Sequence, residues 1–337
     1  MTRNTEPATP AAHSDRTGSA APSGDRLSRL ANYAIMLLIF AALFAGLSIF
    51  VPHFLSVQNM IGLALSVSMV GMVACTMLFC LASGDFDLSV ESQIAFTGVT
   101  AAVVVAHTGS ALLGILAGIV AGGLVGAVNG VTIAKLRINA LIATLASMQI
   151  VRGLGFIVSG GSAVGVANPQ FLALGMGNTL GLPNPVWITM GCFLVFGVLL
   201  NHTRFGRNTL AIGGNREASR LAGVPVDRVK LIIFTLQGLM AGFAGVILAS
   251  RMASGQPNSS VGFSLDVISA CVLGGVSLSG GAGTITGTIV GVLIMGTVQN
   301  AMSLLNVSTF YQYVARGSIL LIAVLLDRLR PVLRRSL

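Results

Sequence analysis

Apolar stretches of about 20 residues recur along the whole chain, and they limit its possible folds more than any other feature. A helix of this length crosses the hydrocarbon layer of a bilayer, which is about 30 Å thick. Charged residues make up only 9% of the sequence, whereas they make up about 25% of a typical soluble domain. The sequence therefore predicts an all-α polytopic membrane protein with about ten transmembrane helices. The ten apolar segments are 33–50, 59–82, 87–106, 111–133, 139–158, 185–201, 231–250, 264–278, 284–304 and 311–326.

The positions of the basic residues indicate how these helices are oriented. With the N-terminus inside, alternate crossings place 16 of the 19 Lys and Arg residues in four cytoplasmic segments, which are the N-terminal tail, the 134–138 turn, the 202–230 loop and the C-terminus. The longest loop on the other side, 159–184, contains neither Lys nor Arg. Basic residues near the ends of a span resist translocation. We therefore expect both the N- and C-termini to be cytoplasmic.

The two ends of the chain differ in composition from its apolar part. Residues 1–30 are rich in Pro, Ser, Thr and Ala and lack the apolar core of a signal peptide, which predicts a disordered cytosolic tail. Residues 31–327 form the expected transmembrane domain, and residues 328–337 a basic cytosolic C-terminus. Because the net charge of +9 is concentrated in the cytoplasmic segments, we expect membrane lipid rather than nucleic acid as a partner.

Glycines recur at every fourth position from Gly114 to Gly130. On a helix these glycines form one stripe, along which a neighbouring backbone can approach closely. We expect the stripe to pack against another helix of the same subunit, and a symmetric contact with a second copy is the alternative. Shorter versions of the pattern occur at Gly238 and Gly242 and at Gly287 and Gly291.

The glycine-rich run "LGGVSLSGGAGT", residues 273–284, raises the question of a nucleotide site. A phosphate loop needs a Lys-Ser or Lys-Thr pair after its glycines. The only lysines of the chain, Lys135 and Lys230, do not follow glycines. We therefore expect a turn at the membrane face, no bound cofactor and no ATP hydrolysis by this chain itself. The sequence also shows no nucleophile–base pair and no metal-ligand spacing, which argues against an enzyme.

Seven charged residues fall inside or at the edges of the apolar segments, where an ionisable group is costly and indicates a function by default. Asp85 and Asp87 would stand about 200° apart on a helix, which favours a break in the backbone near Gly84. Segment 83–89 is therefore either a short loop or a break within the membrane. Asp87 and Glu91 would repel each other on one helical face. The seven residues are Asp85, Asp87, Glu91, Arg152, Arg251, Asp266 and Arg316.

The segment "AIGGNREASRLAGVPVDRVK", residues 211–230, carries six charges in an otherwise apolar chain. Asn215 suits the N-cap of a helix, Gly223 suits the position after its C-cap, and Pro225 prevents its continuation. These signals predict a helix over residues 216–222. An isolated helix of two turns is marginal in water, so it needs a surface to pack against, on this chain or on a cytosolic partner. Its apolar face consists of Ala218, Leu221 and Ala222.

The same segment resembles the cytoplasmic coupling motif of bacterial ABC importer permeases of the ribose, galactose and arabinose type. Four other stretches are similar to motifs of that family in the same order, and the resemblance covers about residues 33–327. These stretches are "LASGDFDLSVES", "NALIATLASMQIVRGLGFIVSGG", "LASRMASGQPN" and "VISACVLGGVSLSGGAGTITGTIVG". Details such as "CTMLFCLASGDFDLSV", "ASRMASGQPNSS" and "NAMSLLNVS" look most like the arabinose branch of the family. One departure is Glu91, where similar permeases usually have a small residue.

The resemblance implies a transport subunit of the bacterial inner membrane that imports a monosaccharide, with L-arabinose as the expected substrate. It implies a homodimer, two cytosolic ATP-binding subunits that use the ATP, and a periplasmic sugar-binding protein. The expected ATPase-coupling residues are Gly213, Gly214, Asn215, Glu217, Arg220, Leu221, Ala222 and Gly223. The expected residues of the translocation path are Asp85, Asp87, Ser89, Gln256 and Asp266.

An ion-coupled secondary sugar carrier or a channel is the main alternative. A carrier would need a carboxylate deep in the membrane, and a channel would need a polar row along a pore. None of the carboxylates lies clearly at the centre of an apolar segment, which favours the importer. A membrane enzyme is a more distant alternative.

Overall fold

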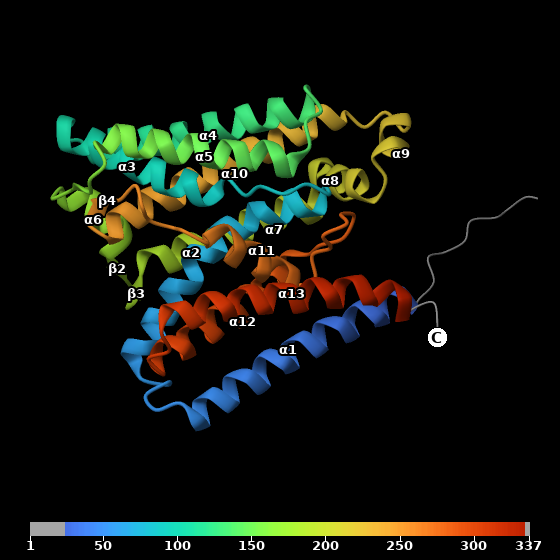
Figure 1. Ribbon diagram of the computed structural model, residues 1–337. Helices are drawn as coiled ribbons and strands as arrows, with labels where there is room; N and C mark the ends of the chain where they lie inside the picture. Colours follow the sequence, from blue (N-terminus) through green and yellow to red (C-terminus); the bar gives the residue numbers. More distant parts are fainter. Residues whose placement is uncertain (1–23, 334–337) are drawn as a thin grey trace, which may run out of the picture.

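The computed structural model describes residues 24–333, and the side chains of residues 34–325. The chain folds into a bundle of long helices, with short strands gathered at one end (Figure 1). The long helices are α1 (Gly24–Phe50), α2 (Val57–Ala82), α3 (Val90–Thr108), α4 (Ala111–Ala134), α5 (Ala140–Ser159), α7 (Asn184–His202), α10 (Val226–Arg251), α12 (Ile285–Leu304) and α13 (Thr309–Leu333). The shorter ones are α6 (Pro169–Met176), α8 (Arg204–Gly214), α9 (Arg216–Leu221) and α11 (Phe263–Leu273).

Each of the ten predicted apolar segments overlaps a helix. Among the described residues, 7 helices are long and apolar enough to cross a membrane, namely α2, α3, α4, α5, α7, α10 and α12. Helices α1 and α13 contain shorter apolar stretches, Ala34–Phe50 and Thr309–Leu325. Helix α11 has 11 residues and is therefore only about 16 Å long, roughly half the thickness of a bilayer core. The prediction of a complete helical span at 264–278 is thus wrong.

The N-terminal region also differs from the expectation. Helix α1 begins at Gly24, so the last part of the expected tail, residues 24–30, is helical rather than disordered. Residues 1–23 and 334–337 lie outside the described residues, and helix α13 extends into the expected basic C-terminus as far as Leu333.

Local sequence signals fix where several of the helices begin. The side-chain oxygens of Ser56, Ser110, Asn139 and Thr284 accept backbone N–H groups in the first turns of α2, α4, α5 and α12. Such caps satisfy donors that the first turn of a helix leaves free, and each stabilises its helix by about 1 kcal/mol. The polar residue before each of these four helices therefore explains its starting point.

The predicted glycine stripe of α4 packs inside the subunit. A Cβ added at Gly126 would lie 2.9 Å from the Cα of Gly238 on α10, and one added at Gly130 would lie 3.1 Å from the Cα of Leu231. Gly287 and Gly291 of α12 make the same kind of close approach to the end of α11. The stripe therefore joins helices of one chain, and a symmetric contact with a second copy is not its role.

Two of the helices are preceded by non-helical chain that enters the bundle. Residues 83–89 leave the end of α2 and run inward before α3 begins, and residues 252–262 lead from the end of α10 to α11 (Figure 1). The N-termini of α3 and α11 meet there, because the backbone N–H of Glu91 donates to Ser264 Oγ at 3.2 Å and Ser264 Oγ donates to the Leu88 carbonyl at 3.0 Å. Of the two alternatives for segment 83–89, the structure thus shows a break within the bundle.

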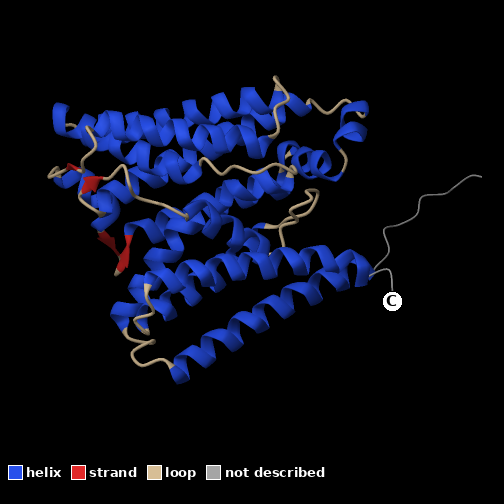
Figure 2. Ribbon diagram, viewed as in Figure 1, coloured by secondary structure: helices blue, strands red, loops and turns tan. Residues whose placement is uncertain are grey.

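The strands lie at the end of the bundle opposite α9. Figure 2 shows them as the small red elements beside long helices. β1 (Val164–Gly165) pairs with β4 (Ser254–Gly255), and β2 (Asn178–Thr179) pairs with β3 (Leu182–Pro183), both antiparallel. They hold the uncharged 159–184 segment, which also contains α6, against the ends of α7 and α10.

Candidate functional site: an exposed polar helix and charged pairs inside the bundle

The predicted polar helix is present as α9. Asn215 Oδ1 accepts the backbone N–H of Ala218 at 2.9 Å, which makes Asn215 the N-cap. Ala222 is the C-cap, and Gly223 follows it with a φ of 81°, a left-handed conformation that glycine adopts without strain. The Val224 N–H then reaches back 3.0 Å to the carbonyl five residues earlier. These bonds form a Schellman motif, so the local sequence signals are sufficient to explain this helix.

Helix α9 presents its apolar side chains to solvent. Leu221 is 82% exposed, and Ala218 and Ala222 are exposed as well, whereas Ser219 is buried. The apolar face is therefore not packed on the chain's own surface. An exposed leucine on a short helix with good caps is suited to a contact with another protein.

A polar hollow of about 270 Å³ lies beside α9. The turn between α4 and α5 contributes Arg137, which has a φ of 57°. Arginines are well suited to pair with carboxylates of a partner, since the guanidinium group can form two parallel hydrogen bonds. The lining residues are Arg137, Arg216, Glu217, Arg220, Val226 and Asp227.

The two glycines predicted to take part in coupling lie at the end of α8, a helix that the sequence analysis did not predict. Gly213 packs so closely on the Ala82 carbonyl that a Cβ there would clash with it. The backbone N–H of Gly281 donates to the same carbonyl at 2.9 Å. Gly214 has open space around it. The end of α2, the end of α8 and the glycine-rich 273–284 turn therefore meet at one point.

Asp85 connects the inward-running segment to the first part of α10. Its carboxylate oxygen lies 2.6 Å from Lys230 Nζ, and the side chains are only 11% and 4% exposed. Lys230 was expected among the basic residues of a cytoplasmic loop, and its pairing with Asp85 was not predicted. The position of Lys230 near the end of an apolar segment does not indicate which carboxylate it pairs with.

Asp87 and Ser89 belong to a completely buried hydrogen-bond network. Ser89 donates its backbone N–H and its hydroxyl to Asp87 Oδ1. The Ser89 hydroxyl also accepts the side-chain amides of Gln93 at 2.7 Å and of Asn129 on α4 at 2.9 Å. The network fixes the end of the inward-running segment against α3 and α4. Asp87 stands outside any helix, so it does not share a helical face with Glu91.

Two carboxylates at the starts of α3 and α11 form ion pairs with arginines. Glu91 lies 2.7 Å from Arg152 on α5, and Asp266 lies 3.2 Å from Arg316 on α13. Arg152 lies twelve residues after the first residue of α5, which is about 18 Å along the helix. The ion pair between Arg152 and Glu91 therefore lies well inside the bundle. Both carboxylates, which were not expected at the centre of an apolar segment, thus lie within the helix bundle. Glu91 also accepts the Gly262 N–H at 2.8 Å, so it caps the start of α11.

Gln256, the fifth residue expected in the translocation path, lies apart from these groups. It follows β4 near the strand end of the bundle, where its side chain donates to Ser254 Oγ at 3.2 Å. The five expected path residues therefore do not form one cluster, and their role in transport stays a prediction.

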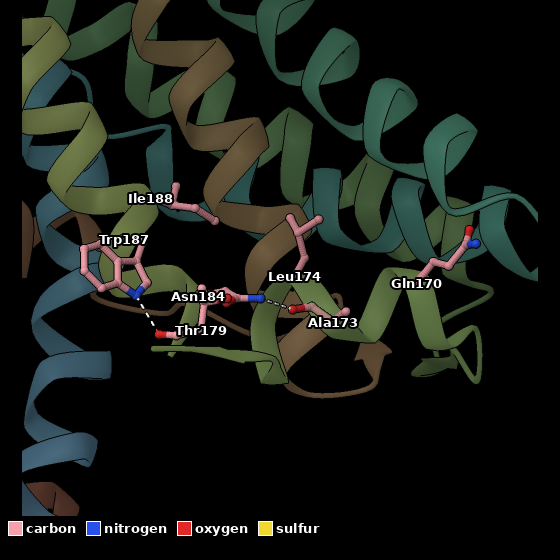
Figure 3. A pocket seen from close by; sticks show the side chains of 7 residues that line it. All are labelled: Gln170, Ala173, Leu174, Thr179, Asn184, Trp187 and Ile188. Carbon is pink, nitrogen blue, oxygen red and sulfur yellow. Dashed lines mark hydrogen bonds between the residues drawn. The ribbon is translucent and has the colours of Figure 1, made fainter. Parts of the chain in front are cut away.

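A second hollow, of about 360 Å³, lies at the strand end of the bundle. Figure 3 shows that its polar groups are already bonded to one another: Trp187 Nε1 donates to the Thr179 carbonyl at 2.9 Å, and Asn184 donates to the Ala173 carbonyl at 2.7 Å. These bonds leave few free polar atoms for a ligand. The hollow is lined by Gln170, Ala173, Leu174, Thr179, Asn184, Trp187 and Ile188.

Comparisons with known proteins show to which family the chain belongs. The family described as branched-chain amino acid transport system / permease component matches residues 59–324. The L-arabinose transport system permease protein AraH of Escherichia coli (strain K12) is 60% identical over 95% of this chain and 98% of its own length. The L-arabinose ABC transporter permease protein AraH of Azospirillum brasilense is 57% identical over 92% of this chain and 91% of its own length.

A ribose permease is similar along most of the chain as well. The ribose import permease protein RbsC of Escherichia coli (strain K12) is 40% identical over 87% of this chain and 92% of its own length. No solved structure matches.

Proposed function

Because this chain belongs to the family of branched-chain amino acid transport system permease components, we propose that it is the membrane-spanning subunit of an ATP-driven importer of L-arabinose. The observation that carries the choice of sugar is the 60% identity to an L-arabinose permease along almost the whole chain. The ribose permease is only 40% identical. The relatives named above are sugar permeases, so the amino acids in the family description are the less favoured cargo.

The chain is a multi-pass protein of a bacterial inner membrane. We propose ten crossings with both termini in the cytosol. In this arrangement residues 83–89 and α3 together make one crossing, and residues 252–262 and α11 together make another. The position of α9 supports this proposal, since the basic turn that contains Arg137 lies beside it at the same end of the bundle.

The proposed complex contains two copies of this chain, two ATP-binding subunits and a periplasmic sugar-binding protein. The exposed Leu221 and the arginine-lined hollow beside it support α9 as the contact for an ATP-binding subunit. ATP is used by that subunit, and this chain acts as the transport subunit.

Two contacts give the coupling helix a route to the interior of the bundle. Through Gly213, the helix before α9 touches the end of α2, where the inward-running segment begins. Through Lys230, the helix after α9 holds Asp85 of the same segment. A displacement of α9 would therefore act on residues 83–89 from both sides and move the start of α3. Packed helices that switch between two arrangements are the usual means of such transmission.

Co-purification with the ATP-binding subunits tests this proposal. We expect the wild-type chain to capture these subunits, and we expect binding protein loaded with L-arabinose to stimulate their ATP hydrolysis. Arg228→Gln, which alters an exposed residue outside α9, serves as the matched control and should behave like the wild type. A chain that captures no ATP-binding subunit, yet takes up sugar in response to a proton gradient, would instead be a secondary carrier.

A further inference from the structure

Among the buried side-chain atoms that have no hydrogen-bond partner within the described residues, four belong to Asp266 and its neighbours on three helices. They are Asp266 Oδ1 and Ser269 Oγ on α11, Gln299 Nε2 on α12 and Arg316 Nε on α13. Leaving a buried donor or acceptor unpaired costs about 1–3 kcal/mol, more for a charged group. Folding alone therefore does not explain why these polar groups are kept inside the bundle.

The four side chains belong to one region. Asp266 and Ser269 are three residues apart and so share a face of α11. Arg316 reaches Asp266 from α13 at 3.2 Å, and the Gln299 side chain lies close to Asp266, although Gln299 Nε2 makes no hydrogen bond of good geometry. Arg316 also stands over the Tyr313 ring, with 5.7 Å between its guanidinium carbon and the ring centre. The cluster thus combines a carboxylate, a hydroxyl, an amide and a guanidinium group.

The cluster adjoins the other ion pair of the bundle through Gly262. A Cβ placed at Gly262 would lie 3.9 Å from Arg316 Nη1, and the Gly262 N–H bonds to Glu91, which pairs with Arg152. The two arginine side chains are 22% and 19% exposed, so this band of charge reaches a surface of the chain. The outer edge of this band is therefore not covered by the described part of the chain.

The charges in this region balance, and this balance restricts the kind of ligand. Two carboxylates face two guanidinium groups, so neither an anion nor a cation gains a net attraction. A neutral molecule with several hydroxyl groups matches the free atoms, because one hydroxyl can donate to a carboxylate oxygen while it accepts from a guanidinium or amide N–H.

We propose that Asp266, Ser269, Gln299 and Arg316 form an intramembrane binding site for a neutral polyhydroxylated molecule. On the proposed function, which this inference deepens, that molecule is the sugar in transit. The site holds the sugar weakly, through hydrogen bonds to the atoms that are otherwise unpaired. Selective recognition outside the membrane is left to the binding protein.

Saturation-transfer NMR on the purified full-length chain with its ATP-binding subunits, without binding protein, tests the site with L-arabinose and D-ribose as probes. Ser269→Ala is the informative variant, because its hydroxyl is buried and unpaired. If the hydroxyl has no ligand, its removal leaves stability equal or higher and binding unchanged. Asp266→Asn removes the central carboxylate. Thr235→Val is the matched control, since that hydroxyl already bonds to the Leu231 carbonyl of its own helix at 2.8 Å.

We expect saturation transfer from the wild type and from Thr235→Val. We expect weaker sugar binding by about fivefold in Ser269→Ala, the effect of one lost hydrogen bond, and no detectable binding in Asp266→Asn. Wild-type signals in both Ser269→Ala and Asp266→Asn, or no signal from the wild type, would overturn the proposal. A different result would separate this site from the proposed function. If the wild-type complex does not import L-arabinose, but D-ribose gives a saturation-transfer signal that is lost in Asp266→Asn, then the proposed cargo is wrong and the proposed binding site is supported.

Discussion

The ion pair between Asp85 and Lys230 allows a quantitative test of how the coupling region is joined to the bundle. Replacing Lys230 with Met keeps the length of the side chain and removes its charge. Because the Asp85 side chain is only 11% exposed, its carboxylate would be left buried without its partner. Breaking a buried pair in this way costs about 3–5 kcal/mol. We therefore expect the free energy of unfolding of Lys230→Met to fall by about this amount.

The double variant Lys230→Met with Asp85→Asn separates the charge effect from a loss of packing. It contains no uncompensated charge, so its free energy of unfolding should lie within about 1 kcal/mol of the wild type. Unfolding of the purified chain by sodium dodecyl sulfate in mixed micelles measures both values. Lys135→Met is the matched control, because Lys135 is exposed at the end of α4 and its loss should change stability by less than about 0.5 kcal/mol. Equal destabilisation of the single and double variants would refute the reasoning.

Three further predictions concern α9, the glycine stripe and the orientation. Leu221→Asp should leave the chain in the membrane but weaken its capture of the ATP-binding subunits, because it puts a carboxylate into an apolar contact at a cost of a few kcal/mol. Normal capture of these subunits in a pull-down would show that α9 only connects α8 and α10. Gly126→Val should lower the free energy of unfolding by about 1–3 kcal/mol, because its side chain would meet the backbone of α10, whereas Gly153→Ala, with open space around it, should not. Cysteines placed at the exposed positions Asn178 and Ala218 should react with an impermeant reagent from opposite sides of the membrane, and reaction from one side would contradict ten crossings.

Much of the fold could be predicted because its signals are local. Apolar segments and caps identify the long helices, and the order Asn215, Gly223 and Pro225 places α9 almost to the residue. The glycine stripe also predicts close packing, since its spacing alone puts every glycine on one face. The sequence does not predict which helix lies against that face, because this depends on the tertiary arrangement.

The parts that were missed depend on contacts between distant residues. Glu91 and Arg152 are 61 positions apart, and nothing in the local sequence of either indicates the other. Comparison with similar permeases made Glu91 look incidental, yet in this chain it pairs with Arg152 and caps α11. Helix α11 was predicted too long, because its apolar sequence continues into the glycine-rich turn while the helix itself stops at Leu273. Helix α8 was missed because it is short and its first turn is polar.

Accumulation of radiolabelled L-arabinose in proteoliposomes that contain this chain, its ATP-binding subunits and the sugar-binding protein tests the central claim most directly. The proposed function predicts uptake that requires ATP on the side of the ATP-binding subunits, continues in the presence of a proton ionophore, and exceeds the uptake of L-leucine under the same conditions. Uptake without the ATP-binding subunits that the ionophore abolishes, or a preference for L-leucine, would contradict it.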